Sequence, residues 1–238
     1  MGALDFEDVV KRFGAATVLD GLSLQLPLTG LTFVVGRSGS GKSVLCRLAV
    51  GLLRPDSGRV LLDGRPIHLL PERELRPLRA RFPYLVQGPA LLDWLTLEEN
   101  VALASRGSKA DGRARAALER VGLGTFAARF PPAVGPGVRK RTAIARALVL
   151  EPTQLLLDEP TTGLDREASR QVNETLELLR GQGLGAIVVS HDYQALARLA
   201  DRVIEIADGR VGFNGTSSAF LATRTEGEQF AHPPSKEY

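Results

Sequence analysis

The sequence contains a single cysteine, few aromatic residues and no long apolar run. Cys46 stands alone, so the chain cannot form an internal disulfide or a cysteine metal cluster, and the apolar helical pattern around it predicts a buried thiol. No apolar run approaches the roughly 18 residues of a membrane-spanning helix. The first residues lack the basic and apolar regions of a secretory signal. We therefore expect a cytoplasmic chain with no transmembrane segment of its own.

Aromatic residues and excess positive charge are also too scarce to indicate nucleic-acid binding. The formal net charge is +3 and aromatic residues make up 5% of the chain, whereas nucleic-acid grooves combine basic stripes with aromatic platforms. Two basic clusters occur, Arg73 to Arg81 and Arg139 to Arg141. We interpret both as solvated helix faces or contacts with a partner protein. The 238 residues, 44% of them hydrophobic, can bury the core of one large domain or two small lobes.

Apolar periodicity switches repeatedly between strand and helix patterns. It predicts strands at residues 17–26, 31–35, 59–62, 155–157, 186–190 and 203–207. Helices are predicted at residues 43–51, 165–181 and 192–200, and, where the strand signal fades, at 98–105, 113–121 and 139–150. This order predicts an α/β fold with a mostly parallel sheet, an N-terminal antiparallel portion and a helical subdomain inserted at about 88–150. We assign residues 1–222 to one domain and 223–238 to a loosely ordered tail.

The strongest motif is a P-loop at residues 36–43, a glycine-rich segment that fits G-x-x-x-x-G-K-[ST] and directly follows the strand predicted at 31–35. Its glycines allow backbone N–H groups to turn inward around phosphate oxygens, and the helix that follows adds the positive end of its dipole. We expect Lys42 to reach the β- and γ-phosphates of ATP and the Ser43 hydroxyl to bind Mg²⁺. The alternative is a glycine-rich turn with a chance lysine. The predicted nucleotide-binding residues are Gly36, Arg37, Ser38, Gly39, Ser40, Gly41, Lys42 and Ser43.

A second motif is an acidic pair at the end of the apolar strand predicted at 155–157. Asp158 is expected at the carboxyl edge of the sheet beside the P-loop, where its carboxylate can hold the Mg²⁺ shell. Glu159 is then placed to polarise a water that attacks the γ-phosphate. An ordinary acidic turn after a buried strand is the alternative. Together with the P-loop, the pair favours ATP hydrolysis over binding alone.

The order of these elements resembles the ATP-binding cassette ATPases over nearly the whole chain. The segments 82–87, 161–165 and 187–192 are similar to the Q-loop, the D-loop and the switch-histidine strand of that family. The resemblance implies that Gln87 senses Mg²⁺ during catalysis, that Asp165 lies at the nucleotide, and that His191 contacts the γ-phosphate. It also implies that adenine stacks on Phe13, for which packing in the core is the alternative. A P-loop kinase or metabolic enzyme is less well supported, because the motif order follows the cassette.

One segment departs from the family pattern. The stretch from Val134 to Val138 stands where the family has a sequence close to L-S-G-G-Q, which holds the γ-phosphate bound by the opposite subunit. Gly135 has no side-chain hydroxyl and Pro136 has no N–H to donate. Within this segment, Gly135 and Gly137 are therefore the residues expected to contact the nucleotide. A charge-assisted hydrogen bond contributes about 1.5–3 kcal/mol, and its loss is expected to slow hydrolysis. Proline in the first turn remains compatible with the helix.

The resemblance also implies partners and a location. It predicts a cassette that dimerises on ATP with an identical or paired ATPase subunit and acts on a membrane permease from the inner face of the cell membrane. Residues 85–102 look like the Mla/MCE phospholipid-transport branch, so transport of a lipid is the first expectation. An importer ATPase for another small solute and a weakly hydrolytic ATP-dependent clamp are the alternatives.

Overall fold

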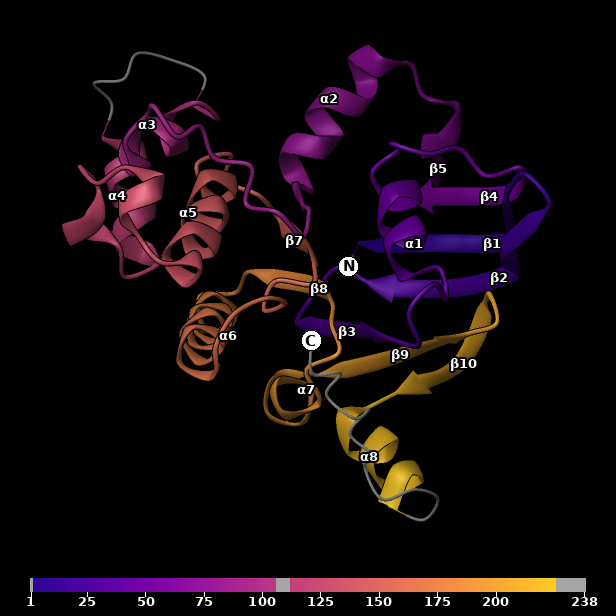
Figure 1. Cartoon of the computed structure of the whole chain (residues 1–238). Coiled ribbons are helices and arrows are strands. Elements are labelled where there is room, and N and C mark those ends of the chain that lie inside the picture. The colour runs from indigo at the N-terminus through magenta and orange to yellow at the C-terminus, as the bar shows by residue number, and fades with distance from the viewer. Residues whose placement is uncertain (1, 106–111, 226–238) are drawn as a thin grey trace.

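The computed structural model describes residues 2–105 and 112–225, whose strands form two sheets (Figure 1). The strands are β1 (Ala3–Phe13), β2 (Ala16–Pro27), β3 (Leu31–Val35), β4 (Ser57–Leu62), β5 (Arg65–Pro66), β6 (Tyr84–Leu85), β7 (Gln154–Asp158), β8 (Gly185–Val189), β9 (Arg202–Ala207) and β10 (Arg210–Gly215). An antiparallel sheet has the order β2-β1-β4-β5, and a larger sheet has the order β10-β9-β3-β8-β7-β6. In the larger sheet all neighbouring pairs are parallel except β10 with β9. The predicted α/β fold is confirmed.

Helices cover the sheets and fill most of the remaining sequence. They are α1 (Lys42–Ala49), α2 (Glu72–Arg81), α3 (Leu97–Ala102), α4 (Arg113–Arg120), α5 (Pro136–Leu148), α6 (Arg166–Gly181), α7 (Tyr193–Leu199) and α8 (Ser217–Thr225), with 3-10 turns η1 (Ile67–Leu69), η3 (Gly124–Phe126) and η4 (Pro131–Ala133). Among the described residues, none of these helices is long and apolar enough to cross a membrane.

The alternation of side chains along β7 divides the interior into two cores. Leu155 and Leu157 belong to a core shared with α3 to α6, whereas Leu156 belongs to a core shared with α1 and the antiparallel sheet. Successive strand residues point to opposite faces, so the buried strand contributes to both cores. Parallel strands are normally covered on both faces in this way. Cys46 of α1 is buried in the second core, as predicted.

The carboxyl ends of the parallel strands lie at one edge of the larger sheet. In register, Val34 of β3 and Asp158 of β7 both pair with Val189 of β8. The loops that follow these three strands therefore start side by side, which is the edge where open α/β sheets bind ligands. Those loops carry most of the predicted site residues.

Helices α3, α4 and α5 pack against one another and lie to one side of α2 in Figure 1. All three fall in the range 88–150, where the described residues form helices, turns and loops. A capping box starts α3, because the Thr96 hydroxyl accepts from the Glu99 N–H while the Glu99 carboxylate accepts from the Thr96 N–H. The chain leaves β6 at the sheet edge that carries the site residues, runs through these helices, and returns from α5 to the amino end of β7 at the opposite edge.

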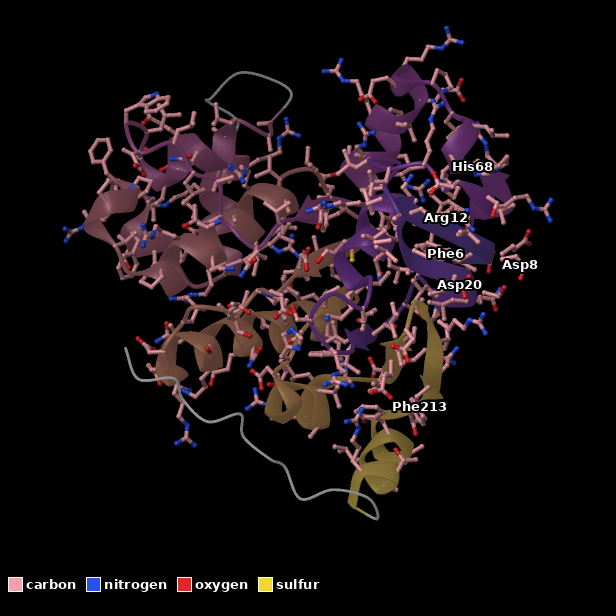
Figure 2. The ribbon with its side chains drawn as sticks, turned by 45° about the vertical axis from the view of Figure 1, so that its right-hand side comes forward. Phe6, Asp8, Arg12, Asp20, His68 and Phe213 are labelled. Carbon is pink, nitrogen blue, oxygen red and sulfur yellow. The ribbon has the colours of Figure 1, made fainter. Side chains whose placement is uncertain are left out.

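Several elements were missed by the sequence prediction. Strand β1 has a positive φ of 46° at Asp8 and register shifts along its pairing with β2, which break the two-residue alternation; Figure 2 shows Asp8 pointing outward. Helix α2 has a proline, Pro77, inside it and is mostly charged. Strand β10 places Phe213 against Phe220 of α8, with ring centroids 5.2 Å apart (Figure 2). Because it ends at Thr225, α8 extends past the predicted boundary at residue 222; residues 226–238 of the predicted tail lie outside the described residues.

Candidate functional site

The loop between β3 and α1 takes a conformation that requires glycine. Gly36 has φ 147° and Gly41 has φ 104°. A Cβ on Gly36 would lie 2.3 Å from the carbonyl oxygen of Ile206, so a larger residue cannot occupy this position without moving β9. Lys42 donates from Nζ to the carbonyl oxygens of Gly36 and Arg37 at 2.8 and 2.9 Å, which keeps its ammonium beneath the loop. Burial lowers the pKa of Lys42, and the nearby acidic pair partly offsets this effect.

Ser43 and Asp158 meet at the start of α1 and provide the oxygen atoms that Mg²⁺ prefers. The Ser43 hydroxyl donates to Asp158 Oδ1 at 3.0 Å. The other carboxylate oxygen, Oδ2, accepts a hydrogen bond of 2.6 Å from the Tyr84 hydroxyl. Hydroxyl and carboxylate oxygens fit a magnesium ion bound together with a phosphate chain. The buried Ser40 hydroxyl, which has no hydrogen-bond partner among the described residues, fits a phosphate oxygen in the same loop.

Tyr84 is a site residue that the sequence prediction missed. It lies on β6, and its pairing with Leu156 of β7 brings its hydroxyl to Asp158. Burial and the hydrogen bond to Asp158 raise the pKa of Tyr84, so the phenol remains a donor at physiological pH. Its distance from Asp158 in the sequence, 74 residues, left no local signal. Only the adjacency of β6 and β7 identifies it.

Glu159 follows β7 and contacts two other loop residues. Its Oε1 lies 2.8 Å from Nε2 of His191, and its Oε2 accepts from the Thr162 hydroxyl at 2.9 Å. The backbone of Glu159 has φ 51°, an uncommon conformation for a residue with a side chain. Its N–H donates to the Val189 carbonyl at 2.9 Å, which fixes the turn to the end of β8. A carboxylate held in this way can accept a proton at a defined position.

A cavity of about 520 Å³ unites most of the predicted site. This volume is in the range of small-ligand pockets. Its lining includes Ser38, Gly39, Gly41, Lys42, Ser43, Phe13, Gln87, Glu159, Thr162 and His191. Phe13 is 48% exposed there, so the alternative of core packing is wrong. Lys11 lies over its ring, with Nζ 5.6 Å from the centroid.

Six predicted nucleotide contacts lie outside this lining: Gly36, Arg37 and Ser40 of the P-loop, and Gly135, Gly137 and Asp165 from two other segments. Gly135 precedes α5 and Pro136 is its first residue, so the helix starts three residues before the range predicted, 139–150. Gly137 is buried against α6, and a Cβ there would lie 2.8 Å from Cβ of Ala168. The Asp165 carboxylate accepts from the Ala168 N–H at 2.8 Å and so caps α6. Gly135, Gly137 and Asp165 form the adjoining starts of α5 and α6, and a role toward nucleotide on another subunit stays a prediction.

The basic cluster at residues 139–141 was interpreted as a solvated face or a partner contact, and this interpretation is wrong for two of its members. Lys140 donates to the backbone carbonyls of Gln87 and Glu159. Arg141 donates to the carbonyl of Val121 and to the side chain of Gln171. Both contacts depend on segments that only the fold brings to α5.

Comparison with known proteins identifies relatives of this chain. Residues 19–162 match the family model described as ABC transporter. The methionine import ATP-binding protein MetN of Mesorhizobium japonicum is 41% identical over 210 residues, which cover 86% of this chain and 58% of that protein. The Fe(3+) ions import ATP-binding protein FbpC of Brucella melitensis is 39% identical over 235 residues, which cover 93% of this chain and 65% of that protein. The chain thus spans about six tenths of the length of these relatives.

Solved structures show the same fold. The structure described as cbiO1 from Clostridium perfringens, part of the ABC transporter complex cbiONQ, has a TM-score of 0.83 and 28% identity and covers 92% of this chain and 90% of that one. The dimeric structure of the ATP-binding cassette MJ0796 bound to ADP and Pi has a TM-score of 0.78 and 28% identity, with 90% of this chain and 98% of that one covered.

Proposed function

The chain belongs to the ABC transporter family, and we propose that it binds and hydrolyses ATP to power a membrane transporter. One observation carries this proposal: a single cavity is lined by Lys42 and Ser43 from the P-loop together with Gln87, Glu159 and His191 from three other loops. A loop that only bound nucleotide would not need a fixed carboxylate and an imidazole beside the phosphate position.

The residues have separate roles in the proposed reaction. Backbone N–H groups of residues 36–43 and the Lys42 ammonium bind the phosphates, and adenine stacks on Phe13. Ser43 and Asp158, together with Gln87 of the cavity lining, would hold Mg²⁺, which when bound would supply positive charge for the phosphate oxygens. Glu159 orients the attacking water and accepts its proton. The His191 imidazole, which lines the same cavity, is assigned the role of donor to the γ-phosphate as negative charge develops.

Exchange of Glu159 for Gln tests the assignment directly. Glu159→Gln keeps the size of the side chain and removes its capacity to accept a proton, so kcat is expected to fall by about 100-fold or more while ATP still binds. Glu151→Gln is a matched control, because Glu151 also has a positive φ (52°) but does not line the cavity. Unchanged turnover in Glu159→Gln protein contradicts the role of Glu159 as base.

A second cassette is proposed as one partner. The starts of α5 and α6, with Gly135, Gly137 and Asp165, do not line this chain's own cavity, which suits a contact with nucleotide on another copy. The cassette MJ0796, similar in fold, is described as dimeric with ADP and Pi bound. Sedimentation of Glu159→Gln protein with and without ATP and Mg²⁺ tests this: a monomer under both conditions argues against dimerisation on ATP.

A membrane permease is proposed as the other partner. A groove of about 260 Å³ between β6, the segment after it, the residues that follow α3, and α5 has a mostly apolar lining that includes Leu85, Val86, Pro89 and Leu103. Val86 and Leu103 are 47% and 56% exposed. We assign the groove to a short helical segment of the permease, which places the chain on the cytoplasmic face of the membrane. Co-purification from membranes tests this assignment, and a chain recovered only as a soluble monomer argues against it.

The transported substrate is proposed from the relatives. MetN and FbpC are named for import of methionine and Fe(3+), so we propose an importer of a small solute. The lipid-transport branch expected from residues 85–102 has no support among these relatives. Transport assays with the assembled complex and labelled methionine, ferric iron or phospholipid separate these substrates.

A weakly hydrolytic clamp is the second candidate, and it is favoured by the start of α5. Gly135 offers no hydroxyl and no side-chain cap, and Pro136 has no N–H. The double exchange Gly135→Ser and Pro136→Gly restores both donors. A rise in turnover of tenfold or more supports an attenuated site, whereas unchanged turnover supports a transporter ATPase that completes the site by other groups.

A further inference from the structure

We propose that Lys140 is a positioning residue that fixes the Gln87 loop and the Glu159 turn to helix α5, so that the place of the base depends on the place of α5. The proposal rests on the function proposed above. Lys140 lies two residues beyond the segment from Val134 to Val138, and it does not line the cavity. Its effect on catalysis must therefore pass through the residues that it holds.

One ammonium group joins three segments that are distant in the sequence. Nζ of Lys140 donates to the backbone carbonyl of Gln87, 53 residues before it, and to that of Glu159, 19 residues after it, the second at 3.2 Å. Gln87 follows β6 and Glu159 follows β7. Lys140 thus connects both loops to the second turn of α5, on the helical side of the site.

The contact with Glu159 stabilises an unfavourable backbone conformation. With φ 51°, Glu159 lies in the left-handed region, which costs free energy for any residue with a Cβ. Three hydrogen bonds hold the turn in place: the Glu159 N–H donates to Val189, and the Glu159 carbonyl accepts from Lys140 at 3.2 Å and from the Thr162 N–H at 3.3 Å. This conformation directs the carboxylate toward Thr162 and His191. The Thr162 bond is internal to the turn and the Val189 bond ties it to β8, so without Lys140 the turn loses its hydrogen bond to α5 and the carboxylate is held less firmly.

Electrostatics supports the same role. Burial lowers the pKa of Lys140, and the negative charges of Glu159 and Asp158 partly offset that effect. A half-buried cation is costly unless its donors are satisfied, and here both identified acceptors belong to loops of the site. A solvated lysine on a helix face would form neither contact.

Arg146 provides a matched control on the same helix. It donates to the carbonyls of Pro89 and Ala90 at 2.9 and 2.6 Å, in the loop that Lys140 contacts at Gln87. Arg146 therefore also fixes this loop to α5 through two backbone carbonyls, but its hydrogen bonds do not include Glu159. Substitution of either residue should loosen the loop and lower activity for that reason. Displacement of the Glu159 carboxylate should follow only from substitution of Lys140.

The test compares the variants Lys140→Met, Lys140→Arg and Arg146→Met in the full chain. Lys140→Met is expected to lower kcat by about 10- to 100-fold with KM for ATP changed less than about twofold, because the cavity lining that binds ATP is intact. Lys140→Arg, which keeps charge and donors, is expected to recover most of kcat. Arg146→Met is expected to keep kcat within about threefold. Equal loss in both Met variants, or a kcat of Lys140→Met at or above the original value, overturns the proposal.

Hydrogen exchange of the nucleotide-free protein provides a readout that does not require hydrolysis. In Lys140→Met, amides of residues 159–163 are expected to exchange at least about tenfold faster, whereas in Arg146→Met faster exchange is confined to residues 87–90. If the original chain shows no ATPase activity but this exchange pattern appears, the proposed function fails and the positioning contact stands. Unchanged exchange at residues 159–163 in Lys140→Met overturns the positioning role.

Discussion

Removal of the Tyr84 hydroxyl is the sharpest test of how the proposed metal site is built. Tyr84→Phe takes one donor from Asp158 Oδ2 and leaves the Ser43 contact on Oδ1. Asp158 is only 6% exposed, so water cannot readily replace the lost bond. A hydrogen bond to a charged group contributes about 1.5–3 kcal/mol. Loss of a residue that orients a metal ligand typically weakens metal affinity about 10–100-fold, or about 1.4–2.8 kcal/mol. The two ranges agree, so we expect Tyr84→Phe to weaken the free energy of metal binding by about 1.4–2.8 kcal/mol.

Electron paramagnetic resonance titration with Mn²⁺, in the presence of a slowly hydrolysed ATP analogue, measures the metal affinity without turnover. Tyr84→Phe is expected to weaken Mn²⁺ binding about 10–100-fold, whereas nucleotide affinity in the absence of metal should be unchanged, because Tyr84 does not line the cavity. Ser43→Ala, which removes a direct ligand, is the positive control. Mn²⁺ affinity within twofold of the original protein refutes the orienting role. A parallel loss of metal-free nucleotide binding would instead show a general disturbance of the loop.

Three further predictions concern stability. Gly36→Ala introduces a Cβ 2.3 Å from a β9 carbonyl and should lower the free energy of urea unfolding by more than about 2 kcal/mol. Gly39→Ala, with open space around it, should lower the same free energy by about 1–2 kcal/mol. Equal losses in the two variants contradict the steric argument. Gly137→Ala places a Cβ 2.8 Å from Cβ of Ala168. A double-mutant cycle with Ala168→Gly should give a coupling free energy of about 1–2 kcal/mol in the same unfolding assay. A coupling free energy of zero refutes the contact. Hydrogen bonding from an arginine on α6 lowers the pKa of Glu167 to about 2. The stabilisation from the ionised Glu167 carboxylate is therefore present above the unfolded pKa of about 4.3 and is lost as the pH falls toward 2. Glu167→Gln should flatten the fall in Tm between these pH values, and an unchanged profile argues against this contribution of Glu167.

The sequence was most informative where a function depends on contiguous residues. The P-loop needs glycines, a lysine and a serine at fixed spacing after a strand, and the structure has β3, the loop and α1 in that order. The edge location of Asp158 followed from an apolar strand that ends in an acidic residue. Strand β1 escaped prediction because its bulges interrupt the alternation, and α2 because Pro77 and many charges obscure the helical pattern.

The sequence by itself determined the fold class, the family resemblance and the residues that line most of the cavity, because short-range spacing encodes strands, turns and glycine-dependent loops. Only the tertiary structure decided that Tyr84 donates to Asp158, that Phe13 is exposed at the cavity, and that Lys140 joins Gln87 to Glu159. Each of these facts depends on strand order or on the packing of α5 beside the sheet edge. Such contacts join residues far apart in the chain, so no local pattern specifies them.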